Sequence, residues 1–120
     1  ETVRGPIQQS VEIMHRLKAR GYPLYGLTNW SAEKFSYTRN KYPIFDALDA
    51  IIVSGIVKLV KPDPRMFNFA LKVIGRPAGE CLLIDDSEKN TQAASQLGFN
   101  TIRFTSPEQL NAELTQKGLL

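Results

Sequence analysis

The sequence predicts a single α/β domain in which helices flank a parallel sheet. The first supporting observation is that four short apolar runs alternate with segments of helical periodicity, a pattern typical of repeated strand–helix units. The second is that polar residues directly follow the apolar runs, as expected where buried strands end at a sheet edge. Ligands bind at the carboxyl ends of parallel strands, so a functional site is expected at that edge.

The four predicted strands are the apolar runs themselves, at residues 24–27, 50–53, 81–84 and 101–104. A helix is expected over residues 6–20, because Pro6 suits a first helical turn and Gly21 suits a helix stop. One face of this helix carries an apolar stripe that should turn inward. The stripe consists of Ile7, Val11, Met14 and Leu17.

The other helices are expected at residues 32–39, 64–74, 88–97 and 106–117. Gly98 suits the end of the third of these, and Ser106 followed by Pro107 is a cap-then-proline opening for the last. A connector over 41–49, a loop over 54–64 and a turn over 75–80 should join them. The apolar side chains expected to face the core in these segments are Ile44, Phe45, Leu48, Phe67, Ala70, Leu71 and Ile74.

Composition argues against several functional classes. The chain has 15 basic and 12 acidic residues, and its net charge of +3 is too mild to indicate nucleic-acid binding. It lacks an apolar run of about 18 residues and a signal-peptide pattern at its polar start, so no membrane association is expected. The single cysteine, Cys81, is expected to be a small buried hydrophobe, which fits a reducing cytoplasm.

The most informative feature is the pair Asp85–Asp86, directly after the third apolar run. Adjacent carboxylates are unfavourable unless a positive group lies between them, and Mg²⁺ is an oxygen-preferring cation that suits this position. A structural interpretation is also open, because acids just before a helix favour its positive dipole end. Asn90, four residues after Asp86, either hydrogen-bonds back to the acids or faces solvent.

Polar residues that suit phosphate follow the two earlier strands. Thr28 and Asn29 follow the first run, and Lys61 opens the segment Lys61-Pro62-Asp63-Pro64 after the second. A hydroxyl and an ammonium suit phosphate oxygens while carboxylates suit Mg²⁺, so together these groups describe a phosphoryl-handling site. The simpler alternatives are that Thr28 and Asn29 satisfy local backbone groups and that Lys61 is a solvated surface lysine.

In their order and spacing these segments resemble a known family. Leu27-Thr28-Asn29, Ser54-Gly55 with Lys61-Pro62-Asp63-Pro64, and Leu83-Ile84-Asp85-Asp86-Ser87 with Asn90 are similar to the second, third and fourth motifs of the haloacid-dehalogenase-like hydrolases. The resemblance spans nearly the whole chain. It is closest to the branch that holds helical-capped phosphatases and 2-haloacid dehalogenases, and it implies a three-layer, Rossmann-like core.

The resemblance also implies a role for each matched residue. Thr28 would hydrogen-bond the transferring phosphoryl group, helped by the Asn29 backbone. Lys61 would neutralise the phosphate and the nucleophile. Asp86 would bind Mg²⁺ directly, with Asp85 assisting through water and the helix after them in support. The implied cofactor is therefore Mg²⁺, and the implied partner is a small phosphorylated metabolite.

The family's nucleophile motif is missing from this chain. The resemblance implies an attacking aspartate in an Asp-x-Asp motif on a first strand, and no two acids of the chain form that motif. We therefore expect the chain to be the C-terminal part of a longer enzyme and to be inactive alone. The missing strand would lie between the strands that end at Thr28 and Asp85, so its absence would expose two strand edges and apolar surface.

Three other functions compete with a Mg²⁺-dependent phosphatase. A 2-haloacid dehalogenase uses no metal, and an acidic pair gives no advantage to a site that must attract a carboxylate anion. A receiver-like phosphoacceptor module also uses paired acids, a hydroxyl residue and a lysine. In such modules, however, the acids come first along the chain and the lysine last. The third is a catalytically inactive scaffold.

Overall fold

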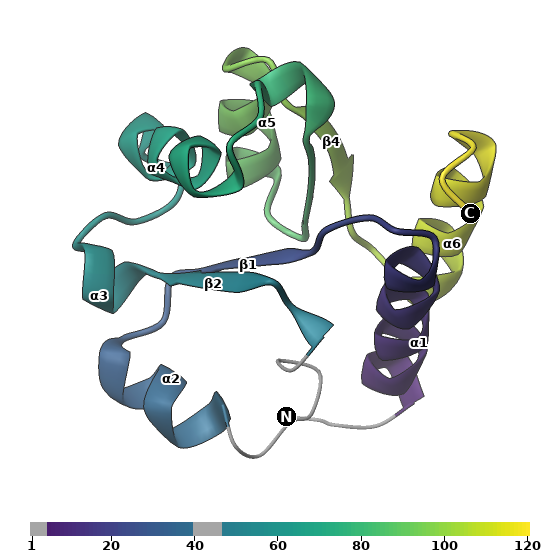
Figure 1. Ribbon diagram of the computed structural model, residues 1–120, viewed down its shortest axis with the longest axis horizontal. Coiled ribbons are helices and arrows are strands. Elements are labelled where there is room, and N and C mark those ends of the chain that lie inside the picture. The colour runs from purple at the N-terminus through teal and green to yellow at the C-terminus, as the bar shows by residue number, and fades with distance from the viewer. Residues whose placement is uncertain (1–4, 40–46) are drawn as a thin grey trace.

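Helices and strands alternate along the chain in the computed structural model, which describes residues 5–39 and 47–120 (Figure 1). The elements are α1 (Gly5–Ala19), β1 (Tyr25–Thr28), α2 (Ala32–Arg39), β2 (Ala50–Val53), α3 (Ser54–Val57), α4 (Pro64–Ile74), η2 (Ala78–Glu80), β3 (Leu82–Asp85), α5 (Glu88–Gln96), β4 (Asn100–Arg103) and α6 (Pro107–Gln116). The α/β class predicted from the sequence is confirmed. Ile44, Phe45 and the side chain of Ile7 lie outside the described residues.

The strands form two parallel pairs instead of one continuous sheet. β1 pairs with β2, with Thr28 opposite Val53, and β3 pairs with β4, with Asp85 opposite Arg103. Parallel pairing agrees with the prediction, and each strand boundary falls within one residue of its apolar run. Neither sheet has a third strand among the described residues. The inner edges of β1 and β3 therefore lack a strand neighbour in this part of the chain.

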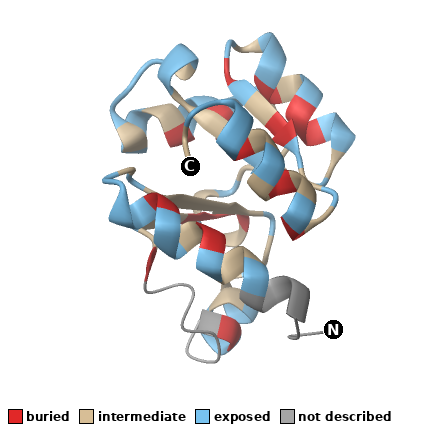
Figure 2. Ribbon diagram, turned by 90° about the vertical axis from the view of Figure 1, so that its right-hand side faces the viewer, coloured by how far each residue is buried: buried red, intermediate tan, exposed pale blue. Residues whose placement is uncertain are grey.

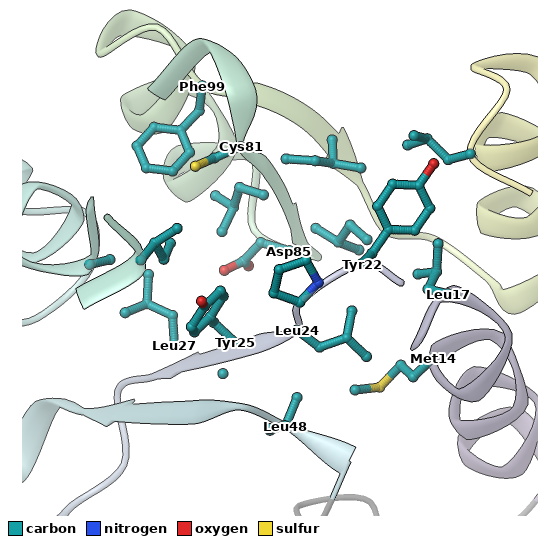
Figure 3. Close-up of a pocket in the computed structure, with 18 of the residues that line it drawn as sticks. Met14, Leu17, Tyr22, Leu24, Tyr25, Leu27, Leu48, Cys81, Asp85 and Phe99 are labelled. Carbon is teal, nitrogen blue, oxygen red and sulfur yellow. The ribbon is translucent and has the colours of Figure 1, made fainter. Parts of the chain in front are cut away.

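A cleft of about 960 Å³ lies between the two sheets. Its lining comes from β1 on one side and β3 on the other, with α1 closing one end. Figure 3 shows Tyr25 and Leu27 on one wall, Cys81 and Asp85 on the opposite wall, and Met14 at the α1 end. The exposed edges and apolar surface expected between these strands are thus gathered into one cleft.

The apolar core is divided into three clusters. Figure 2 shows that the buried residues are spread over several helices and strands and are not gathered in one element. One cluster joins α1 to β4 and α6, the second joins β2 to α4, and the third joins α4 to α5. Ile13 and Leu17 are the buried residues of α1, whereas Val11 and Met14 are only half-buried. The inward face of α1 is therefore rotated from the predicted stripe, so that Ile13 and Leu17 pack against β4 and α6.

Helix α4 lies near the functional edge, and one of its faces is deeply buried. Met66 and Phe67 are completely buried, and Ala70 is nearly so. The sequence pattern identified Phe67 and Ala70 but missed Met66. The helix starts as expected, since the Asp63 carboxylate accepts a hydrogen bond from the Arg65 N–H at 2.9 Å. A well-packed α4 fixes the position of the loop that precedes it.

The predicted loop over residues 54–64 begins with a helical turn, α3. It is closed by a hydrogen bond of 2.8 Å from the Lys58 N–H to the Ser54 carbonyl, and Lys58 takes a left-handed conformation with φ of 66°. One turn is too short to show an apolar periodicity, which explains why the sequence pattern missed it. Within residues 5–39 and 47–120, no helix is long and apolar enough to cross a membrane.

Candidate active site

The candidate site lies where three parallel strands end. Thr28 is the last residue of β1, Asp85 is the last residue of β3, and Ser54 directly follows β2. Lys61 lies in the loop between α3 and α4. Parallel strands deliver their carboxyl ends to one side of a sheet, so segments that are distant in sequence converge there.

A buried ion pair joins the loop between α3 and α4 to the end of β3. The Lys61 Nζ donates to Asp85 Oδ2 at 2.7 Å, and the two side chains are only 11% and 7% exposed. Asp85 also accepts hydrogen bonds from the Ser87 N–H at 2.9 Å and from the Asn90 amide at 3.2 Å. Both carboxylate oxygens of Asp85 are thus engaged by protein donors.

These donors determine the charge state of Asp85. Burial acts to raise the pKa of this carboxyl, but the Lys61 ammonium, the Ser87 N–H and the Asn90 amide all favour the charged form. Their combined effect holds the pKa of Asp85 below its ordinary value. Asp85 is therefore ionised at neutral pH and balances the charge of Lys61.

The side chain of Asn29 connects the end of β1 to the same lysine. Asn29 Oδ1 accepts a hydrogen bond from the Lys61 N–H at 2.8 Å, and Asn29 Nδ2 donates to the Lys61 carbonyl at 3.1 Å. The sequence predicted a phosphate-binding role for the Asn29 backbone, or a contact of its side chain with local backbone groups, but not this contact with Lys61. The available signal was that an amide side chain offers a donor and an acceptor together, which matches one residue of extended main chain.

The hydroxyl of Thr28 has a defined orientation. Thr28 Oγ1 accepts a hydrogen bond from the Trp30 N–H at 3.1 Å, so one lone pair of the oxygen is occupied. Within residues 5–39 and 47–120 the hydroxyl proton has no acceptor, so it can be donated to a bound oxyanion. Thr28 is joined to the Lys61–Asp85 pair through its chain neighbour Asn29.

The loops after β1 and β2 approach each other very closely at Gly55. The Gly55 N–H donates to the Trp30 carbonyl at 3.0 Å. A Cβ built at Gly55 would lie 2.4 Å from the Ala32 nitrogen and 2.8 Å from the Ser31 Cα. Only glycine permits this approach, which explains the Ser54-Gly55 pair in physical terms.

Asp86 differs from its neighbour Asp85 in being exposed. Its carbonyl accepts a hydrogen bond from Arg103 Nε at 3.3 Å, which anchors the backbone beside the site. Within residues 5–39 and 47–120, no three His, Cys, Asp or Glu residues form a metal-binding group. An exposed carboxylate in the lining of the cleft nevertheless suits Mg²⁺, which commonly takes one or two carboxylates together with water and phosphate oxygens.

The structure brings some of the predicted site residues into direct contact. Lys61 pairs with Asp85 and lies on the same side of the molecule as the acidic pair. The Asn90 amide donates a hydrogen bond to Asp85, which resolves the alternative left open by the sequence. The catalytic, substrate-binding and metal-binding roles of Thr28, Lys61 and Asp86 stay predictions.

Comparison with protein families gives a direct match. Residues 4–98 match the family described as haloacid dehalogenase-like hydrolase, which is most of the chain. The chain belongs to the haloacid dehalogenase-like hydrolases. The resemblance found from the sequence motifs is thereby confirmed, and the protein is assigned to a family of enzymes.

Relatives within the family include both phosphatases and dehalogenases. The chain is 29% identical to a sesquiterpene phosphatase of Aspergillus oryzae, over 92% of this chain and 57% of the relative. It is 28% identical to an (S)-2-haloacid dehalogenase of Burkholderia cepacia, over 79% of this chain and 41% of the relative. The chain thus spans only about half the length of these relatives.

Solved structures show the same fold. A Bacteroides thetaiotaomicron enzyme of the family, in complex with magnesium and inorganic phosphate, is 25% identical and has a TM-score of 0.74. The match covers 82% of this chain and 52% of that one. A dehalogenase with an intermediate complex is 27% identical and has a TM-score of 0.75, covering 81% of this chain and 43% of that one.

Proposed function

We propose that this chain is the C-terminal part of a Mg²⁺-dependent phosphatase that acts on a small phosphorylated metabolite. The observation that carries the proposal is the buried Lys61–Asp85 pair, with exposed Asp86 beside it. A buried lysine offers a positive charge for phosphate, and a neighbouring exposed carboxylate offers an oxygen ligand for a cation. The phosphatase relative and the magnesium–phosphate complex support the same choice.

The reaction needs a nucleophile from outside this chain. We propose that an aspartate of the longer protein attacks phosphorus, so that a new P–O bond forms and the bond to the leaving alcohol oxygen breaks. Water then attacks the acyl phosphate, which releases inorganic phosphate and restores the carboxylate. Thr28 would donate its hydroxyl proton to a phosphoryl oxygen, and Lys61 would balance the negative charge of phosphate and nucleophile.

The cleft between the two sheets is where we expect that nucleophile to lie. Its walls are the inner edges of β1 and β3, and Asp85 lies in its lining together with Lys61 and Asp86. A parallel strand of the longer protein in this cleft would complete the sheet. It would also bring its carboxyl end to Lys61, where an attacking carboxylate is required.

Magnesium would be held by Asp86. The cation would neutralise charge on the phosphoryl group. Asp85 is already engaged by three protein donors, so its contribution would be to hold Lys61 in place and to bind the cation only through water.

A 2-haloacid dehalogenase is the second candidate, because several relatives carry that activity. The exposed negative charge of Asp86 argues against it, since the substrate of such an enzyme is itself a carboxylate anion. The receiver-like module is no longer supported, because the family match places the chain among hydrolases.

The two enzyme activities are distinguished by one assay on the full-length protein. We expect release of phosphate from p-nitrophenyl phosphate with MgCl₂, loss of that activity with EDTA, and no chloride release from 2-chloropropionate. Chloride release that is unaffected by EDTA, with no phosphate release, would establish the dehalogenase instead.

A further inference from the structure

We propose that the side chain of Asn29 is a positioning residue, which holds the main chain of Lys61 so that its ammonium reaches the phosphate. This inference rests on the proposed function and deepens it. The sequence motifs give Asn29 only a backbone role, whereas the structure gives its side chain a separate task. The task is carried out at the Lys61 main chain and not at the substrate.

The contact itself is a two-point clamp. The Asn29 amide accepts from the Lys61 N–H at 2.8 Å and donates to the Lys61 carbonyl at 3.1 Å. Two hydrogen bonds to one residue fix its rotation as well as its position, which a single bond cannot do. The main chain of Lys61 is therefore tied to the end of β1.

The other end of Lys61 is held separately. Its Nζ lies 2.7 Å from Asp85 Oδ2, at the end of β3. Lys61 thus bridges the two sheets, with its backbone anchored on the β1 side and its ammonium anchored on the β3 side. Lysine has four rotatable side-chain bonds, so anchoring both ends greatly reduces the positions that the ammonium can occupy.

Loss of the clamp should leave the ion pair able to form but allow the Lys61 loop to move. Pro62 in that loop is exposed, and so is Asn29 in the loop after β1. Since Thr28 precedes Asn29 directly, the clamp also fixes the distance between the Thr28 hydroxyl and the lysine. Phosphate must contact both groups together, so its affinity should depend on that distance.

The test is a double-mutant cycle in the full-length protein, with the dissociation constant for inorganic phosphate measured by calorimetry in MgCl₂. Asn29→Ala should weaken phosphate binding about tenfold, as expected for the loss of one to two hydrogen bonds. Lys61→Ala should weaken it more. The double variant should bind phosphate like Lys61→Ala alone, because Asn29 acts through the lysine.

Asn100→Ala is the matched control. Asn100 also bridges main-chain carbonyls with its amide, donating to Gly79 at 2.9 Å and to Cys81 at 3.4 Å. It lies at the amino end of β4, away from the site, so its loss should lower the melting temperature without changing phosphate affinity. If Asn29→Ala does not fold, Asn29→Ser keeps one polar contact and should show a smaller loss of affinity.

Three results would overturn the inference. Normal phosphate affinity in Asn29→Ala, with weakened affinity in Lys61→Ala, would reject the clamp and leave the proposed function intact. If the double variant weakens phosphate binding by the product of the two single-variant factors, Asn29 acts independently of Lys61. Normal phosphate affinity in Lys61→Ala would contradict the inference and the proposed function together.

Discussion

Asp85 and Asp86 are neighbours in sequence but lie in opposite environments. Asp85 is 7% exposed and is bound by Lys61, Ser87 and Asn90, whereas Asp86 is exposed. Alternation along the end of a strand is the physical reason, since successive side chains point to opposite faces. One carboxylate is thus used to hold a lysine, and the other remains accessible to a cation.

Asp85→Asn should destabilise the full-length protein at neutral pH and remove part of its acid sensitivity. Breaking a buried pair leaves Lys61 without its counter-charge, at a loss of about 3 kcal/mol in unfolding free energy. The pKa of Asp85 is lowered in the folded state. Its stabilisation is therefore present above the unfolded pKa, near 3.9, and is lost as pH falls through the folded value.

Urea unfolding at pH 7 and at about pH 3 checks this expectation. The difference in unfolding free energy between the parent and Asp85→Asn should be smaller at the lower pH. Glu80→Gln is the control, because it breaks an ion pair between exposed side chains, Arg76 and Glu80, at 3.1 Å. The account would be contradicted if the parent and Asp85→Asn differed in unfolding free energy by the same amount at both pH values.

At the scale of elements, the contact between the loops after β1 and β2 depends on Gly55. Gly55→Ala should force these loops apart, because the new Cβ would lie 2.4 Å from a backbone nitrogen that cannot rotate away. Overpacking of this kind costs about 1–3 kcal/mol. Thermal unfolding measures the loss, and Gly79→Ala is the control, since no atom lies within 4 Å of its added Cβ. Equal stability of Gly55→Ala and the parent would mean that the loops are not in close contact.

Elements with a strong local pattern could be predicted from the sequence. The apolar runs located all four strands within one residue, and Pro64 with Gly75 located both ends of α4. Helix α3 was missed because a single turn has no periodicity. The buried face of α1 was misplaced because the observed face includes Ile13, which the predicted stripe does not contain. Only the tertiary partner shows which side of a helix is covered.

The candidate site could be predicted in its residue types but not in its pairings. The order of Thr28, Lys61 and Asp85 indicated one sheet edge, and the structure brings Lys61 to Asp85. The sequence could not show which of Asp85 and Asp86 would be buried, since burial depends on what packs over the strand end. The Asn29 clamp was missed because the amide of Asn29 shows that it can bind a main-chain segment but not which one, and the segment lies 32 residues away.

At the scale of the whole molecule, the proposed reaction needs a nucleophile that this chain does not contain. The 120-residue chain alone should not hydrolyse p-nitrophenyl phosphate, because a hydroxyl and an amine cannot replace a carboxylate nucleophile. Loss of a nucleophile commonly lowers the rate on the order of 10⁴-fold or more. The full-length protein, assayed beside it, is the control. Turnover by the chain alone that is abolished by Asp86→Asn would contradict the account.

The Mg²⁺ dependence of full-length variants tests the central claim most directly. A carboxylate is an oxygen ligand for Mg²⁺, whereas a lysine supplies only a positive charge. Phosphatase activity of the parent, Asp86→Asn and Lys61→Ala is therefore measured against MgCl₂ concentration. Excess Mg²⁺ should partly restore Asp86→Asn and should not restore Lys61→Ala. Identical Mg²⁺ dependence in all three proteins would mean that Asp86 holds no metal and would contradict the proposed phosphatase site.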